Sequence, residues 1–265
     1  MSTDPKFMPF KTPAEVIAAY QSIQALIEPN LNKYFGITPK TAFQIRQTEA
    51  FRAASASAEY QPGTPDGKRP GVFYVPILDA TKFNTTSGMQ SLFLHEAIPG
   101  HHFQLSIQSE NTKLPKFRRY GNSNAYAEGW ALYCESLGPE LGLYKDPYQY
   151  MGALGDEMHR AIRLVVDVGM HAKGMTREEA IQYVMDNEAI SEAAAVAEIE
   201  RYMAIPGQAL SYKIGALSIR ALRAKYEKQL GDKFKVNLFH DVLLEDGSLP
   251  LEVLEKKMDK WAAKQ

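Results

Sequence analysis

The sequence predicts a mainly helical protein with a small antiparallel β-sheet near its N-terminus, an α+β fold class. Apolar residues recur at helical spacing over residues 16–31 and over most of residues 85–265. Between them, residues 41–78 alternate apolar with polar positions and are rich in aromatic and β-branched side chains. We therefore expect an N-terminal helix region over residues 1–40 and a single domain over residues 41–265.

The first predicted helix has a defined start and end. Thr12 can cap its N-terminus, Pro13 suits the first turn, and Glu15 can reach back to the cap residue. Gly36 and Pro39 end it, because neither residue favours continuation of a helix.

Two segments between residues 41 and 78 predict strands. Phe43 and Ile45 alternate with polar residues, and the run at 71–77 is β-branched and aromatic. Pro76 cannot donate a ladder hydrogen bond, so the second strand either lies at the sheet edge or ends there. The turn-forming segment 61–67 separates the two, and we expect two to four strands in an antiparallel sheet.

After a capping cluster at residues 84–87, the chain is predicted to stay helical almost to its end. Glycine or proline follows several of the predicted helices, as is typical of helix ends. The predicted helices cover residues 124–137, 148–173 and 208–229, one starts with a capping box of Thr176 and Glu179, one starts at Ser191, and two shorter ones close the chain.

Composition and charge are ordinary for a globular protein. The 265 residues are 45% hydrophobic and 23% charged, and the formal net charge of -1 gives no reason to expect nucleic acid or an anionic membrane as a partner. The single cysteine, Cys134, excludes an internal disulfide and fits a reducing compartment. The sequence starts without a signal-peptide pattern, and no apolar run reaches the ~20 residues that span a bilayer. We expect a cytoplasmic protein, unless a targeting region precedes this sequence.

Residues 94–103 concentrate groups that can bind a metal. The segment holds three of the six histidines and the carboxylate of Glu96, between apolar flanks. Zincins place two histidines four residues apart on one helix, with a glutamate after the first as general base. Here Pro99 stands where the second histidine would be, so the standard motif is absent.

Helix geometry ranks the two histidines that follow His95. On a straight helix His101 would lie about 600° around the axis, and His102 would lie ~10.5 Å along it, so neither would share a metal with His95. Pro99 removes a backbone donor and Gly100 is permissive, so the helix must widen or break there. Because a bulge that absorbs two residues brings His101 to the one-turn position, we predict His95 and His101 as ligands. His102 would support the site or contact substrate.

The segment at 124–135 places two carboxylates, Glu128 and Glu135, on one helix face. We predict Glu128 as the third ligand, because Gly129 beside it leaves room for close approach to the histidine helix. Glu135 would then orient a ligand or pair with a base elsewhere. A single buried histidine is more often a hydrogen-bonded core residue, and a glutamate before glycine can be solvated. The coincidence of His95-Glu96, a Pro-Gly break, His101-His102 and a helix with two glutamates downstream favours a metal centre.

Four segments resemble motifs of the bacterial family called domain of unknown function 885, namely residues 95–104, 126–135, 163–171 and 209–215. The family is regarded as a group of candidate zinc metallopeptidases, distantly similar to helical gluzincins such as the oligopeptidases. The resemblance, from about residue 40 onward, implies a zincin-like or oligopeptidase-like architecture with one Zn²⁺. Family members are usually about twice as long, which implies a missing N-terminal half that would form the opposite wall of a substrate channel.

A stripe of polar residues on a later helix is a further candidate site. His159, Arg163, Asp167 and His171 follow at four-residue steps. In one interpretation, Arg163 and Asp167 form an internal ion pair that fixes helix packing. In the other, His171 or Arg163 binds a carboxylate or carbonyl of the substrate.

The helix at 208–229 supplies two more candidates. By analogy with the gluzincins that the sequence resembles, Tyr212 would stabilise the oxyanion formed on the attacked carbonyl. The alternative is an ordinary helix tyrosine with its hydroxyl at the surface. Arg220 could hold the C-terminal carboxylate of a substrate in a bidentate grip.

The predicted activity is hydrolysis of peptide bonds. Zn²⁺ held by His95, His101 and Glu128 would activate a water, and Glu96 would accept its proton as the general base. The strand at 72–75 precedes the histidine helix, and an exposed edge there could hold a peptide substrate by strand addition. Two alternatives stay open: a hydrolase of non-peptide amides or esters, and a metal-binding fragment without activity. A homo-oligomer or the missing half would be the partner.

Overall fold

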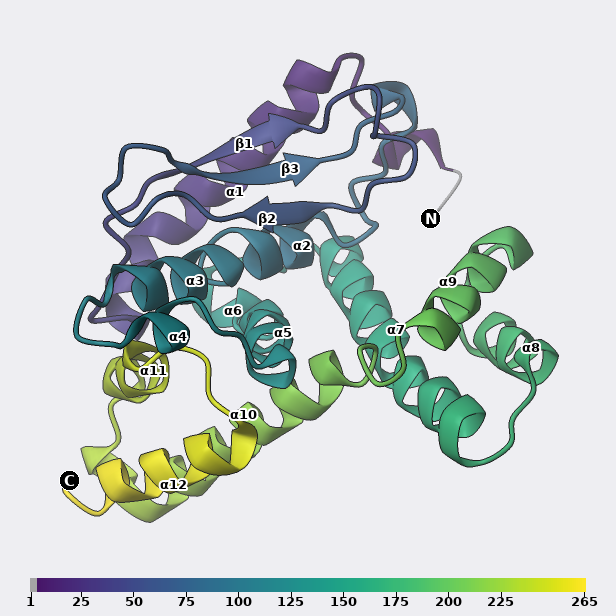
Figure 1. Ribbon diagram of the computed structural model, residues 1–265. Coiled ribbons are helices and arrows are strands. Elements are labelled where there is room, and N and C mark those ends of the chain that lie inside the picture. The colour runs from purple at the N-terminus through teal and green to yellow at the C-terminus, as the bar shows by residue number, and fades with distance from the viewer. Residues whose placement is uncertain (1–3) are drawn as a thin grey trace.

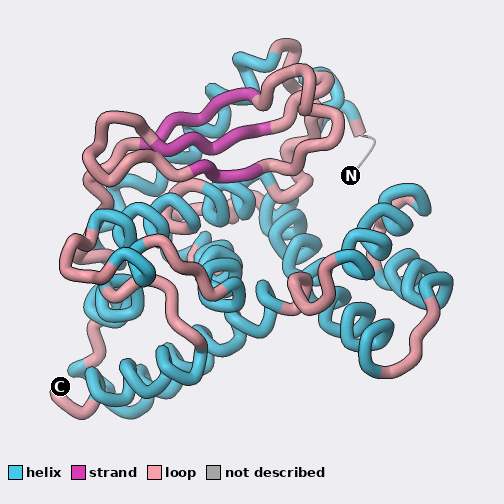
Figure 2. Tube along the Cα trace, in the orientation of Figure 1, coloured by secondary structure: helices cyan, strands magenta, loops and turns pink. Residues whose placement is uncertain are grey.

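The computed structural model describes residues 4–265 and confirms a mainly helical chain with one small sheet (Figure 1, Figure 2). A 3-10 turn, η1 (Pro5–Phe7), precedes the first long helix, α1 (Pro13–Tyr34). The Thr12 side chain accepts a hydrogen bond from the backbone N–H of Glu15, so the predicted N-cap is confirmed. Figure 1 shows α1 running behind the sheet.

The sheet has three strands, β1 (Phe43–Gln47), β2 (Glu59–Gln61) and β3 (Gly71–Val75), in the order β1-β3-β2. β1 runs parallel to β3, and β2 runs antiparallel to β3. The sheet is therefore mixed, and the prediction of an antiparallel sheet was wrong in this respect. The sequence pattern does not reveal β2, because its three residues are too few to show alternation.

β3 is the central strand of the sheet. It ends at Val75, directly before Pro76, because the proline ring has no N–H to offer the ladder. Both edges of β3 are paired, so strand addition along residues 72–75 is excluded. The sheet edge that lies next to α2 (Met89–Glu96) belongs to β2 (Figure 1).

One hydrophobic core joins the sheet, α1 and the central helices. Tyr20 of α1 is fully buried, and its ring lies 5.3 Å from that of Phe73 on β3 and 6.4 Å from that of Phe93 on α2. Leu94, next to the first histidine of the motif, is also fully buried. The end of α2 is therefore held by close packing on the side of the helix that faces the core.

The remainder of the described chain is helices and their connections. The predicted helix starts at Thr176 and Ser191 are confirmed, and Thr176 forms its capping box with Glu179. None of the helices within residues 4–265 has the length and apolar character to cross a membrane. After α2 the helices are α3 (His101–Glu110), α4 (Lys116–Arg119), α5 (Asn124–Glu135), α6 (Gly138–Leu141), α7 (Pro147–Ala172), α8 (Arg177–Asn187), α9 (Glu192–Ala204), α10 (Ser211–Leu230), α11 (Val236–Glu245) and α12 (Leu251–Ala262), with 3-10 turns η2 (Ala80–Lys82) and η3 (Gly231–Lys233).

A second hydrophobic cluster lies at the far end of α7. Ile162 and Val166 of α7 pack there against buried apolar residues of α8 and α9, such as Val184 and Ile199. In Figure 1, α8 and α9 stand apart from the sheet and from the C-terminal helices. Because α7 also contacts α2, it connects this cluster to the main core.

Candidate metal centre

The helix that carries the histidine motif is broken in two. α2 ends at Glu96, residues 97–100 form a turn, and α3 begins at His101. Pro99 has no N–H with which to continue α2. A Cβ on Gly100 would lie 1.9 Å from the backbone oxygen of His95, so only glycine lets the chain pass this close to the end of α2. The predicted distortion at Pro-Gly is therefore present, as a complete break.

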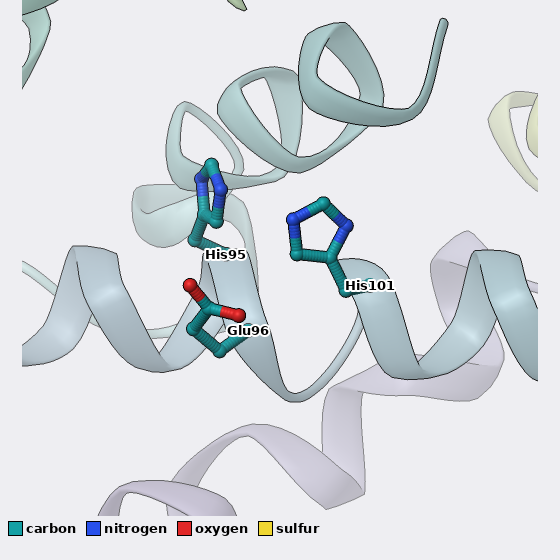
Figure 3. Close-up of side chains that lie close together, drawn as sticks. All are labelled: His95, Glu96 and His101. Carbon is teal, nitrogen blue, oxygen red and sulfur yellow. The ribbon is translucent and has the colours of Figure 1, made fainter. Parts of the chain in front are cut away.

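The break brings His95 and His101 together. Their ring centroids are 4.8 Å apart, and the rings are nearly perpendicular. Figure 3 shows His95 and Glu96 leaving the end of α2 and His101 leaving the start of α3. Potential ligand atoms of these three residues all lie within 4.8 Å of one another.

Glu128 approaches both imidazoles from α5. Its Oε2 atom lies 3.5 Å from Nε2 of His95 and 3.4 Å from Nε2 of His101. The same oxygen is buried and has no hydrogen-bond partner among the described residues, so its contacts with the imidazoles are ion-pair contacts. Burial opposes ionisation of Glu128, but its contacts with the two histidines hold its pKa well below the usual range.

These residues fit a zinc ion. Imidazole nitrogen and carboxylate oxygen are ordinary zinc ligands, and in a tetrahedral site at ~2.1 Å from the ion they lie about 3.4 Å apart. The separations of Glu128 Oε2 from the two Nε2 atoms match this value. The unpaired Oε2 is the kind of buried acceptor that a cation satisfies. His95, His101 and Glu128 would hold the ion.

Glu135 fixes the orientation of His95. Its Oε1 atom lies 2.7 Å from Nδ1 of His95, so Nδ1–H donates and Nε2 is left to bind a metal. Burial alone would lower the pKa of His95, but its close contacts with the carboxylates of Glu128 and Glu135 outweigh that effect and raise the pKa to about 10. The two carboxylates therefore stabilise positive charge at His95, whether a proton or a metal ion carries it.

Glu96 lies beside the two histidines and is nearly inaccessible to solvent. Burial raises the pKa of its carboxyl, and His101 and His95 lower it again only in part. The backbone of Tyr60, on the edge strand β2, also acts on this carboxylate. A carboxyl with a raised pKa is suited to accept and return a proton near neutral pH.

Tyr212, at the start of α10, completes the group. Its ring stacks on that of His95, with centroids 6.0 Å apart at 19°, and Nε2 of Gln208 donates to its hydroxyl at 3.3 Å. The guanidinium groups of Arg163 and Arg160 lie 4.9 and 5.9 Å from its ring centroid. Burial raises the pKa of the phenol, so its proton is retained.

Two glycines set the distance between α5 and α10. A Cβ on Gly129 would lie 2.4 Å from Cα of Gly215, and a Cβ on Gly215 would lie 1.8 Å from the backbone oxygen of Ala125. The helices therefore cross in backbone contact, and this close crossing sets the position of Tyr212, whose ring stacks on His95. Gly129 was expected to allow approach to the histidine helix, but its contact is with α10.

The other predicted substrate-binding residues lie outside this group. His102 points away, with Nδ1 2.8 Å from the hydroxyl of Tyr60, and burial lowers its pKa to about 4. Nη1 of Arg220 lies 2.6 Å from Oε1 of Glu157. The Nδ1–H of His171 donates to the backbone oxygen of Asp167 within the same helix.

Arg163 is near Tyr212 but has partners of its own. Its Nε donates to the hydroxyl of Tyr202 at 2.8 Å and to Nε2 of His159 at 3.1 Å, and its Nη2 lies 3.4 Å from Glu198. Asp167 instead accepts the backbone N–H of Gly207. The internal ion pair considered for Arg163 is therefore with Glu198 on α9.

Sequence reasoning missed Arg160. Its Nη2 atom lies 3.8 Å from Glu135 Oε1, the oxygen that also contacts His95 Nδ1, and its Nη1 lies 3.7 Å from Asp156. The available signal was the spacing of Asp156 and Arg160, which places opposite charges one helical turn apart.

Two solved structures are similar to this chain. A putative lipoprotein from Colwellia psychrerythraea is 37% identical, with a TM-score of 0.94, and the match covers 100% of this chain and 46% of that one. A putative lipoprotein of unknown function from Shewanella oneidensis is 26% identical, with a TM-score of 0.80, and the match covers 96% of this chain and 47% of that one. The chain thus spans less than half the length of either protein. No curated protein matches it.

The family comparison covers nearly the whole chain. The model described as "Bacterial protein of unknown function (DUF885)" matches residues 1–258. The match begins at residue 1, so the expectation that the likeness starts near residue 40 was too narrow. This extent identifies the chain as a member of the bacterial family of unknown function DUF885.

Proposed function

We propose that this protein is a zinc-dependent metallopeptidase. The observation that carries the proposal is the convergence of two imidazole Nε2 atoms on the unpaired, buried Oε2 of Glu128 at 3.5 and 3.4 Å. When bound, zinc would supply Lewis acidity for a water and for the attacked carbonyl. A general base, Glu96, and a phenol, Tyr212, border the same space, as this chemistry requires.

In the proposed reaction, Glu96 accepts the proton of the attacking water and passes it to the leaving amine. Its burial favours this role, because a raised pKa makes the carboxylate a better base. Tyr212 donates its hydroxyl proton in a hydrogen bond to the oxygen on which charge develops. Gln208 donates to that hydroxyl and therefore leaves the phenolic proton available. Glu135 holds His95 in the required tautomer.

The choice of peptides as substrate rests on the edge strand β2. This strand pairs with β3 on one side, and its other edge lies beside α2 (Figure 1). The backbone of Tyr60 on β2 lies close enough to the Glu96 carboxyl to lower its pKa. A peptide that extended the sheet along this edge would pass the general base with its carbonyl groups. The cytoplasmic localisation expected from the sequence stays a prediction, and the two similar proteins are described as putative lipoproteins.

The test combines metal analysis with a substrate panel. Elemental analysis should find one zinc per chain, and a peptide library should be cleaved, with products identified by mass spectrometry. Glu96→Gln should keep the zinc and lose at least 10²-fold in rate. Full activity of Glu96→Gln with zinc in place would contradict the assignment.

Two other outcomes correspond to the alternatives. Cleavage of esters or small amides without cleavage of any peptide would assign the site to non-peptide substrates. Zinc binding without turnover would fit a metal-binding fragment, since the chain spans less than half of its solved relatives.

A further inference from the structure

One cavity is lined in part by Arg160, whose guanidinium lies 3.8 Å from Glu135, the partner of His95. Its volume is ≈ 510 Å³, and its walls are α7, residues 86–87 before α2 and residues 188–189 before α9. Gly155 opens part of the wall, because a Cβ added there would meet nothing within 4 Å. The ionisable side chains on the wall are Asp156, His159, Arg160 and Glu188.

Arg160 differs from its neighbouring arginines in what it binds. Among the described residues its guanidinium makes one hydrogen bond, from Nη1 to the backbone oxygen of Asp156 at 3.2 Å. Its Nε is buried without a partner. Nη2 has Glu135 Oε1 as an acceptor only at 3.8 Å, which is too long for a hydrogen bond. Arg220 also has an unpartnered Nε, but its Nη1 donates to the Glu157 carboxylate at 2.6 Å. Arg163 donates from Nε to Tyr202 at 2.8 Å. Arg160 therefore differs from both in having no side-chain acceptor within hydrogen-bond distance in the described part of the chain.

The acidic groups of the cavity wall are already engaged. Glu188 lies 2.7 Å from Nδ1 of His159. Asp156 accepts the hydroxyl of Ser91 at 2.5 Å. An isolated guanidinium carries five N–H donors, so Arg160 retains donors that these carboxylates do not fill.

We propose that this cavity is a subsite for a carboxylate of the peptide substrate, held by Arg160. The proposal rests on the metallopeptidase function above and specifies its substrate class. Nη2 of Arg160 lies 3.8 Å from Glu135 Oε1, and the same oxygen lies 2.7 Å from Nδ1 of His95. The guanidinium is therefore no more than about 6.5 Å from this metal-ligand candidate, about two extended residues. A carboxylate that close to the cleaved bond is either the substrate's C-terminus or an acidic side chain near it.

Binding measurements on zinc-loaded Glu96→Gln protein separate these two sources. The probes are a hexapeptide of alanine and leucine as the free acid, the same hexapeptide as its C-terminal amide, and that amide with one glutamate near its C-terminus. Isothermal titration should find the free acid, the glutamate peptide or both at least about tenfold tighter than the plain amide. The preferred probe identifies which carboxylate is bound.

Adding Arg160→Gln should reduce this preference to about one, and Arg160→Lys should keep part of it. Arg220→Gln is the matched control, because Lys213 still neutralises Glu157 in that variant and the preference should persist. Zinc content and thermal denaturation of each variant show whether the metal centre and the fold survive. Equal binding of all three probes, or a preference that persists in folded, zinc-loaded Arg160→Gln protein, would overturn the proposal.

The two proposals fail in different ways. If the protein hydrolyses peptides and its affinity for them does not depend on a carboxylate, the subsite proposal is wrong and the metallopeptidase proposal stands. If the protein prefers ligands with a carboxylate, this preference depends on Arg160, and no peptide is cleaved, the subsite proposal stands and the metallopeptidase proposal is wrong.

Discussion

The indole N–H of Trp130 donates to the backbone oxygen of Pro99 at 2.9 Å. Trp130 is fully buried and lies on α5, two residues after Glu128. Pro99 lies in the break between α2 and α3. One hydrogen bond therefore ties the helix of the third predicted ligand to the backbone that separates the two histidines.

Trp130→Phe should weaken both the fold and metal binding. The phenyl ring keeps much of the packing, but the oxygen of Pro99 loses its donor, which costs about 1–3 kcal/mol when the group stays buried. Zinc affinity should fall as well, because the break is less firmly held. Urea denaturation and titration against a competing chelator measure the two effects.

Tyr133→Phe is the control for this prediction. Tyr133 is also buried on α5, but its hydroxyl bonds His240 and Arg223 rather than the break. This variant should lose stability and keep its zinc affinity. Equal zinc affinities in Trp130→Phe and Tyr133→Phe would show that the Trp130 bond does not position the ligands.

Gly215→Ala should destabilise the protein strongly. A Cβ at this position would lie 1.8 Å from the backbone oxygen of Ala125, so α5 and α10 must separate. Overpacking of this kind costs about 1–3 kcal/mol or more. Because Tyr212 precedes Gly215 by one helical turn, hydrolysis should fall further than the loss of folded protein explains. Thermal denaturation and the rate per folded molecule test both points.

Gly155→Ala gives the comparison. This glycine lies within α7, and a Cβ there meets nothing within 4 Å. Alanine should therefore raise the free energy of unfolding by about 0.5–1 kcal/mol. If both variants changed stability in the same direction, the close contact of α5 with α10 would not be the cause.

The local part of the site could be predicted from the sequence. His95, Glu96 and His101 are close in the chain, and the conformational limits of Pro99 and Gly100 indicate where the helix must give way. Glu128 could be predicted to lie beside the two histidines, where the structure has it, because ligand chemistry restricts the choice to a few residue types. A bulge was expected and a complete break occurs, since nothing local distinguishes the two.

Partner choices over long sequence distances could not be predicted. Arg220 pairs with Glu157, and Arg163 pairs with Glu198, in each case on a different helix. Which arginine keeps free donors depends on how α7, α9 and α10 pack. The position of β3 likewise depends on β2, which is too short to leave a pattern.

Glu135→Gln should lower zinc affinity by about 10–100-fold, which is typical when a group that orients a histidine ligand is changed. The amide can still accept from His95 Nδ1, but it no longer carries the charge that makes the imidazole a strong donor to the metal. Glu140→Gln is the control, because Glu140 lies on α6 and pairs with Arg223 of α10 rather than with a histidine of the site. Competitive chelation measures both, and equal zinc affinity in the two variants would contradict the role of Glu135.

His240 is a buried histidine held in its neutral form. Its Nδ1–H donates to the backbone oxygen of Tyr34, and its Nε2 accepts the hydroxyl of Tyr133, both at 2.8 Å. Burial, together with the charge of Arg223, lowers its pKa to about 3, against the partial opposing effect of the Tyr34 bond. A second proton would have to bind Nε2, and that would break the hydrogen bond that Tyr133 donates to this nitrogen.

Protonation of His240 should therefore destabilise the fold in acid. Because the folded-state pKa lies below that of the unfolded chain, the unfolded state binds more protons, and stability falls as the pH drops from about 6.5 towards about 3. The contribution of one such group reaches ~1.4 kcal/mol per pH unit. His240→Gln can keep both hydrogen bonds but loses the ring packed against Phe35 and Trp130, so it should be less stable than the parent at pH 7. Because glutamine does not titrate, this variant should lose less stability than the parent on acidification. Urea denaturation of both proteins from pH 7 to pH 4 measures the difference between their free energies of unfolding, and this difference should become smaller as the pH falls. A constant difference would mean that His240 titrates alike in the folded and unfolded chains.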